Sequence, residues 1–184
     1  VFSRHPLLIK MNGNALNDPR VTIINQDAFK FVAGNHQLYH LIILDFPDPR
    51  NHDLAKLYSL EFYQYVKLSM AKGAMVATQS TSPLFSSNSF YAIKKTMEAA
   101  GLNVLSLHQN MKSFDEWGFQ IGSLQISEPE MRQKLDKYQE ITPTRFLNSQ
   151  AVQAAFRWGK DFLQDTRKLP VNTLLNLSLV NIYN

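Results

Sequence analysis

The segment 39–49 constrains the fold more than any other part of the chain. It reads Tyr-His-Leu-Ile-Ile-Leu-Asp-Phe-Pro-Asp-Pro. Because residues 41–44 carry no polar side chain, the segment predicts a β-strand at 39–45 that is buried on both faces, as in a parallel sheet. Asp45 falls where this strand ends, and in open α/β sheets ligands bind at the carboxyl ends of the strands. The sequence therefore predicts a binding site next to Asp45.

Two prolines stiffen the loop that follows this strand. Pro47 and Pro49 fix their own φ angles and keep the residues before them out of helical geometry. The loop is expected to present Asp45 and Asp48 together in one crevice. Two carboxylates there suit a positively charged ligand, and one of them can accept a proton. Asp and Pro are also common in plain turns, but the apolar strand in front favours a binding site.

Composition narrows the classes of function. The chain has 184 residues, of which 45% are hydrophobic and 18% charged, as is typical of one globular domain with a sizeable core. Its net charge of +4 comes from scattered basic residues, which argues against a nucleic-acid surface. The sequence has no cysteine, which excludes thiol chemistry, and its five histidines show no metal-ligand spacing. No apolar run approaches the roughly 18 residues that a membrane helix needs.

Apolar patterns along the rest of the chain predict alternating strands and helices. Strands are expected at 21–25, 39–45, 74–79, 102–108 and 119–126. Helices are expected to end near residue 12, to span 28–32, to follow the every-fourth-residue pattern from Leu54 to Met70, and to run from about 88 to 100. Nothing helical separates the last two strands, so they are expected to be antiparallel neighbours. This order predicts an α/β sheet with helices on both faces.

Five short motifs follow one another along these elements. They are Gln26-Asp27-Ala28, Asp45-Phe46-Pro47-Asp48-Pro49, Leu57-Tyr58 with Glu61-Phe62-Tyr63, Gln79 with Ser82-Pro83, and Trp117-Gly118-Phe119. In this order they resemble the motifs of the polyamine aminopropyltransferases, the spermidine synthase family. The tail from about residue 129 resembles that of the subgroup whose catalytic domain is attached to membrane spans, which would lie outside this chain.

The resemblance implies a partial Rossmann-like sheet of the class I methyltransferase type, with a catalytic domain at 1–128 and a helical carboxy-terminal extension at 129–184. The family's first two nucleotide-binding strands, its glycine-rich turn and its amino-terminal β-hairpin domain have no counterpart in this sequence, which starts with Val1 and not with Met. We therefore expect a piece of a longer protein. The two strands would lie between 21–25 and 39–45, so two strand edges would be open. The chain would then borrow those strands, dimerise across the gap, or leave 21–25 displaced.

The same resemblance implies an enzyme that transfers the aminopropyl group of decarboxylated S-adenosylmethionine to putrescine, giving spermidine and methylthioadenosine. This chemistry requires no metal and no cofactor besides the co-substrate. The implied partners are small polyamine and nucleoside molecules in the cytoplasm, and a second copy of the chain or the missing segments. Taken alone, the chain is expected to be inactive.

The family's functional positions fall on residues of these motifs. By resemblance, Asp45 is the catalytic base and Asp48 holds the amine. Gln79 would line the diamine slot, and Asp27 and Ala28 would bind the adenine edge.

Plainer roles compete with some of these assignments. Asp27 can simply cap the helix that follows it, and Gln79 can satisfy backbone groups at a strand end. Tyr58 and Phe62 are expected in the core. Phe114 stands where the family often has a tyrosine that touches the polyamine, so the choice of amine stays open.

Two other functions stay open as well. A methyltransferase that uses S-adenosylmethionine can have the same fold, although most methyl acceptors do not need two carboxylates such as Asp45 and Asp48. A non-enzymatic interaction domain, a remnant whose nucleotide site is gone, would agree with a sequence that lacks the glycine-rich turn.

Overall fold

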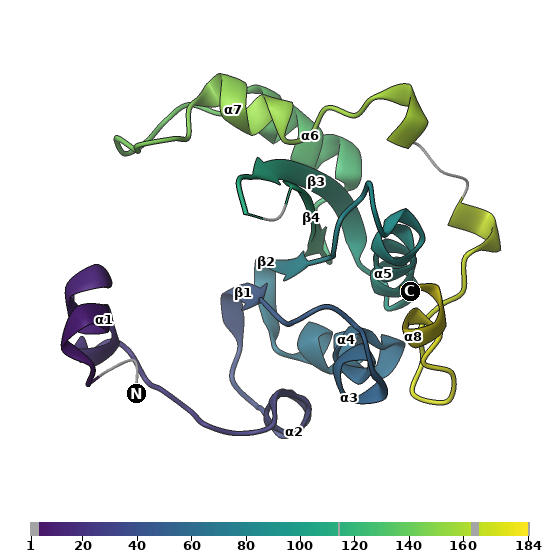
Figure 1. Cartoon of the computed structure of the whole chain (residues 1–184), viewed down its shortest axis with the longest axis horizontal. Helices are drawn as coiled ribbons and strands as arrows, with labels where there is room; N and C mark the ends of the chain where they lie inside the picture. Colours follow the sequence, from purple (N-terminus) through teal and green to yellow (C-terminus); the bar gives the residue numbers. More distant parts are fainter. Residues whose placement is uncertain (1–3, 114, 163–165, 184) are drawn as a thin grey trace.

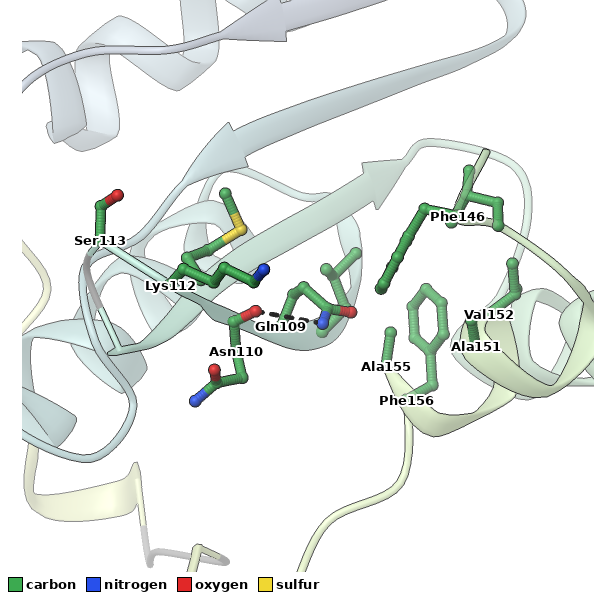
Figure 2. Close-up of a pocket in the computed structure, with 12 residues that line it drawn as sticks. Gln109, Asn110, Lys112, Ser113, Phe146, Ala151, Val152, Ala155 and Phe156 are labelled. Atoms are coloured by element: carbon green, nitrogen blue, oxygen red, sulfur yellow. Dashed lines mark hydrogen bonds between the residues drawn. The ribbon is translucent and has the colours of Figure 1, made fainter. Parts of the chain in front are cut away.

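The computed structural model describes residues 4–113, 115–162 and 166–183 and shows an α/β fold (Figure 1). Its sheet has four strands in the order β1-β2-β4-β3. The strands are β1 (Tyr39–Leu44), β2 (Met70–Gln79), β3 (Asn103–Met111) and β4 (Asp115–Ser123). β1 and β2 are parallel, whereas β4 runs antiparallel to both β2 and β3. The predicted antiparallel pair is therefore confirmed.

Short helices connect and extend these strands. In the first part of the chain they are α1 (Pro6–Met11), η1 (Ala15–Asn17), α2 (Ala28–Ala33), α3 (His52–Ala55), η2 (Lys56–Tyr58), α4 (Leu60–Leu68) and α5 (Ser87–Ala99). In the second part they are α6 (Glu128–Asp136), α7 (Ser149–Ala154), η3 (Lys160–Phe162), η4 (Thr166–Lys168) and α8 (Leu179–Ile182).

The single helix predicted from Leu54 to Met70 is wrong, because three short helices occupy this region. Ser59 starts the last of them, α4, with its side chain accepting a hydrogen bond from the Phe62 N–H at 3.2 Å. Tyr58 and Phe62 lie on either side of the break between η2 and α4, and both are fully buried. The four-residue apolar spacing therefore continues through the break. Periodicity alone therefore could not reveal the break.

Helices cover both faces of the sheet, as predicted. Val104 and Leu105 are neighbours on β3 and point to opposite faces, because side chains alternate along a strand. Val104 belongs to a core with α4 and α5, whereas Leu105 packs with Met131 of α6 and Phe156 after α7. Figure 1 shows the same division, with α4 and α5 on one side of the sheet and α6 and α7 on the other.

The carboxy-terminal segment returns to the first of these cores. Leu179 of α8 is fully buried there, and so is Asn172. The Asn172 Nδ2 donates to the Ala55 carbonyl at 2.8 Å, and its Oδ1 accepts from the Leu179 N–H at 3.3 Å. The Asn172 backbone N–H donates to Thr96 Oγ1 at 3.0 Å, and its carbonyl accepts from the Leu60 N–H at 2.8 Å. One asparagine therefore ties the tail to α3, α4 and α5.

The strand predicted at 21–25 is wrong. These residues have no regular secondary structure and pair with no strand in the described part of the chain. A cavity of about 560 Å³ is lined by Thr22 and Ile24 of this segment and by Leu41 of β1. It lies where the resemblance places two further strands. In this single chain the segment is therefore displaced from the sheet, and borrowed strands and pairing with a second copy stay predictions.

The strand β1 is also less buried than predicted. Leu44 is buried, but Leu41 is 60% exposed and Ile43 is 69% exposed. β1 pairs only with β2 among the described strands, so it is an edge strand. The helices on the second face pack around Leu105 of β3 instead of reaching β1. An apolar run shows that a strand can be buried, but not that a neighbour is present to bury it.

The open edge of β1 predicts that the chain associates with itself, because unpaired edge strands with apolar side chains are templates for pairing. Leu41→Lys places a charge at an exposed edge position and is expected to reduce light scattering at equal protein concentration. The free energy of unfolding should change by less than about 0.5 kcal/mol. The matched variant Ile42→Lys changes the neighbouring side chain, which packs against the core, and should cost about 2 kcal/mol or more. Equal scattering from Leu41→Lys and the unchanged chain would show that this edge is not the contact.

Candidate active site

Parallel strands bring the predicted polar residues to one edge of the sheet. β1 ends at Leu44, one residue before Asp45, and β2 ends at Gln79. Leu44 pairs with Thr78 across the ladder, so the two carboxyl ends lie level. β4 runs in the opposite direction and pairs Phe119 with Gln79. The site is therefore built from one end of each of three neighbouring strands.

Gln79 is the central polar side chain of this edge. Its Nε2 donates to Asp48 Oδ1 at 2.9 Å and to the Phe46 carbonyl at 3.0 Å. Its Oε1 accepts from the Thr81 N–H at 2.5 Å. Thr81 has a φ of 65°, a left-handed conformation that is rare for a β-branched residue. Gln79 thus satisfies backbone groups around a strained turn, and it also lies against Asp48.

The proline loop rests on a buried tyrosine. The Tyr58 hydroxyl donates to the carbonyls of Phe46 and Pro47, each at 3.1 Å. The Phe46 ring packs edge-on against Tyr58 and Phe62, with centroids 6.2 and 5.7 Å away. Burial raises the pKa of Tyr58 far above its usual range, so the phenol stays a neutral donor. Tyr58 and Phe62 are core residues, as predicted, and they hold the loop from the core side.

Gly118 allows β4 to pass close to α5. A Cβ atom at this position would lie 2.4 Å from the Phe90 ring and 2.9 Å from the Thr81 carbonyl. The Gly118 N–H donates to that same carbonyl at 2.7 Å. The glycine of the Trp117-Gly118-Phe119 motif is therefore required by packing, and it places Trp117 in the wall of the site.

Asp48 is buried and is held through both of its oxygens. Its side chain is 7% exposed, and its Oδ1 accepts the hydrogen bond from Gln79. Its Oδ2 accepts from the Tyr183 hydroxyl at 2.6 Å, and the Arg50 Nη2 lies 3.7 Å from the same oxygen. The Arg50 guanidinium also lies over the Tyr183 ring, 5.8 Å from its centroid. Burial and the hydrogen bond to Asp48 raise the pKa of Tyr183, so it too stays a donor.

The contribution of Tyr183 was missed by the sequence reasoning. This residue is 135 positions from Asp48 and follows α8 directly. The signal in the tail is the apolar run around Leu179, which predicts burial but not the surface that the tail meets.

Asp45 is placed very differently from Asp48. Its side chain is exposed, and within the described residues it forms no hydrogen bond or ion pair. It lines a hollow of about 490 Å³ together with Ile43, whereas Asp48 lines an adjoining hollow of about 510 Å³. Gln79 and Trp117 line both hollows. The two acids therefore face adjoining hollows with a common wall, and not the one crevice that was predicted.

The residues predicted to contact adenine lie apart from these hollows. Asp27 caps α2 by accepting a hydrogen bond from the Lys30 N–H at 3.0 Å, which lowers the Asp27 pKa. The Lys56 Nζ lies 3.5 Å from its other oxygen. Neither Asp27 nor Ala28 lines either hollow. The capping role of Asp27 is confirmed, and the adenine contacts of both residues stay predictions.

Phe114 lies outside the described residues, so its contact with the amine also stays a prediction. Within the ranges 4–113, 115–162 and 166–183, no three His, Cys, Asp or Glu side chains are grouped so that they could hold a metal ion. The helices of these same ranges are each too short or too polar to cross a membrane.

Comparison with known proteins decides the family. The sequence pattern described as the spermine/spermidine synthase domain matches residues 2–134. The chain belongs to the spermine/spermidine synthase family. The polyamine aminopropyltransferase of Leptospira interrogans is 35% identical over 185 residues, which cover 100% of this chain and 35% of the relative. The enzyme of the same name from Shewanella oneidensis is 37% identical over 180 residues, covering 96% of this chain and 31% of that one.

This family member spans about a third of the length of the curated relatives it matches. Solved structures agree with the fold. A spermidine synthase in complex with the transition-state analogue AdoDATO matches with a TM-score of 0.68 at 17% identity, over 85% of this chain and 57% of that one. The spermidine synthase of Thermotoga maritima matches with a TM-score of 0.65 at 18% identity, over 85% and 56%. The Rossmann-like fold class is therefore confirmed, and the membrane-attached subgroup stays a prediction.

Proposed function

We propose that this member of the spermine/spermidine synthase family transfers an aminopropyl group from decarboxylated S-adenosylmethionine to putrescine, releasing spermidine and methylthioadenosine. The observation that carries the proposal is a pair of carboxylates with different surroundings in the loop after β1. Asp45 is exposed and unpaired within the described residues, whereas Asp48 is buried and held by three neighbours. The names of the curated relatives support the same reaction.

Asp45 is suited to remove one proton from the acceptor. A free alkylamine is mostly protonated at neutral pH and cannot act as a nucleophile until it loses a proton. Asp45 accepts this proton as a general base and leaves a neutral amine. The amine lone pair then forms a bond to the aminopropyl carbon, and the carbon–sulfur bond breaks with its electron pair moving to the sulfonium sulfur. Methylthioadenosine leaves as a neutral thioether, and the new secondary amine carries the positive charge.

Asp48 is suited to hold the far end of the acceptor. Gln79 and Tyr183 fix its two oxygens, so the carboxylate has one orientation before an amine arrives. A fixed anchor for one end of a diamine places the other end near Asp45, because the two hollows share the wall made by Gln79 and Trp117. Positioning of this kind supplies much of the rate of a bimolecular transfer.

The nucleoside half of the proposal follows from the family resemblance. Asp27 and Ala28 are assigned to the adenine edge, and Phe114 to the polyamine. No cofactor besides the co-substrate is proposed. The cytoplasmic location, the pairing with another copy or with further segments, and the lack of activity of the chain alone are part of the same proposal.

Calorimetric titration with putrescine and with methylthioadenosine tests this function. We expect the full-length protein to bind both, because the two carboxylates bind the amine and the proposed nucleoside site binds methylthioadenosine. Binding of the nucleoside without any di- or triamine would favour a methyltransferase. Binding of neither would favour a non-enzymatic domain.

A further inference from the structure

Asp48 is the carboxylate proposed to hold the amine, and one of its oxygens already has protein partners. Asp48 Oδ2 accepts a hydrogen bond from Tyr183 at 2.6 Å and lies 3.7 Å from the Arg50 guanidinium. The Arg50 guanidinium lies over the Tyr183 ring, and both residues line the Asp48 hollow. We call these two side chains the Arg50–Tyr183 cap.

The cap makes the two hollows electrostatically unequal. In the Asp48 hollow, the negative charge of Asp48 is opposed by the positive charge of Arg50, and these are the two charged residues among its lining. In the Asp45 hollow, Asp45 is the charged residue of the lining. A cation entering the site therefore meets an uncompensated carboxylate at Asp45 and a compensated one at Asp48.

A second ammonium at Asp48 must approach the Arg50 guanidinium. Like charges a few ångströms apart repel, and the repulsion is weakened where water reaches one of them. The Arg50 side chain is 71% exposed, so the repulsion is moderate and is sensitive to salt. Tyr183 adds to the effect because its hydroxyl occupies an acceptor position of Asp48 that an ammonium would otherwise use.

We propose that the Arg50–Tyr183 cap determines specificity: it weakens the hold of Asp48 on a second ammonium group and so reduces the preference of the site for diamines over monoamines. The inference rests on the proposed function, because it takes an amine to be the ligand of both hollows. It assigns a role to the carboxy-terminal tail, which carries Tyr183 into the site.

Two amines of equal length test the cap. Butane-1,4-diamine carries two ammonium groups and butylamine carries one, so the ratio of their affinities isolates the far charge. In the full-length protein at low salt, Arg50→Gln is expected to raise the ratio of diamine affinity to monoamine affinity about three- to tenfold. Arg50→Lys keeps the charge and should leave the ratio within about twofold of the unchanged chain. Tyr183→Phe keeps the ring under Arg50 and removes only the hydroxyl, and should raise the ratio about twofold.

The affinities are measured by calorimetry, with thermal melts to verify that each variant is folded. A general loss of structure would not change the affinity ratio, because both amines have the same carbon chain and the same amine at the reacting end. An unchanged or lower affinity ratio in Arg50→Gln overturns the proposed role of the cap. A lower ratio in Tyr183→Phe also overturns it, because the hydroxyl would then be a ligand of the ammonium. If neither amine binds the unchanged full-length protein, the amine site of the proposed function fails, and this inference fails with it. Binding of both amines with no effect of Arg50 overturns the inference alone.

Discussion

Replacing Asp45 by asparagine is expected to lower kcat for aminopropyl transfer by at least about 100-fold in the full-length enzyme, because the amide cannot accept the proton of the ammonium. Asparagine has nearly the same shape as aspartate, and Asp45 forms no hydrogen bond or ion pair with the described residues, so the fold should not change. Binding of methylthioadenosine should stay within about twofold, since the loss concerns the amine. Single-turnover formation of spermidine measures the first effect, and calorimetry measures the second.

Asp53→Asn is the matched control for this experiment. Asp53 stands on α3, close in sequence to the loop, with its side chain 93% exposed and a Lys56 ion pair at 3.7 Å. The same chemical change there should leave kcat within about twofold, because exposed ion pairs contribute little. If Asp45→Asn retained more than half of the kcat while Asp53→Asn behaved as expected, Asp45 would not be the base.

The second large effect is expected on stability, from Asn172→Ala. Asn172 is fully buried, and its side chain joins the Ala55 carbonyl to the Leu179 N–H. Alanine leaves two buried backbone groups without partners, which should lower the free energy of unfolding by about 2 to 4 kcal/mol. Denaturant unfolding followed by circular dichroism measures this change.

Asn176→Ala is the control for Asn172, because Asn176 is exposed in the same segment. It should change the free energy of unfolding by less than about 0.5 kcal/mol. A further consequence concerns the site, since Asn172 anchors the segment that carries Tyr183. Loss of the anchor should weaken the contact of Tyr183 with Asp48. Equal stabilities of the two variants would show that the tail does not depend on the buried asparagine.

The polar residues at the sheet edge could be predicted because their position depends on local pattern. Asp45 and Gln79 each stand at the end of an apolar strand, and parallel strands bring such ends together. Local sequence patterns also predicted the helix N-cap at Asp27 and the core positions Tyr58 and Phe62. The α/β class followed from the order of strands and helices, and its Rossmann-like type followed from the family resemblance.

The errors concern features that depend on distant partners. Leu41 and Ile43 have the composition of a buried strand, but their exposure depends on whether a neighbouring strand is present. The segment 21–25 has strand-forming residues and lacks a strand to pair with. The contact of Tyr183 with Asp48 joins residues 135 positions apart, and an apolar tail does not specify the surface on which it packs.

The roles of Asp45 and Asp48 can be tested by a crystal structure of the full-length protein with putrescine and methylthioadenosine. We expect one putrescine nitrogen about 3 Å from a carboxylate oxygen of Asp45 and the other in the hollow beside Asp48. A diamine bound elsewhere, with Asp45 facing solvent and Asp48 still closed off by Arg50 and Tyr183, would contradict these roles.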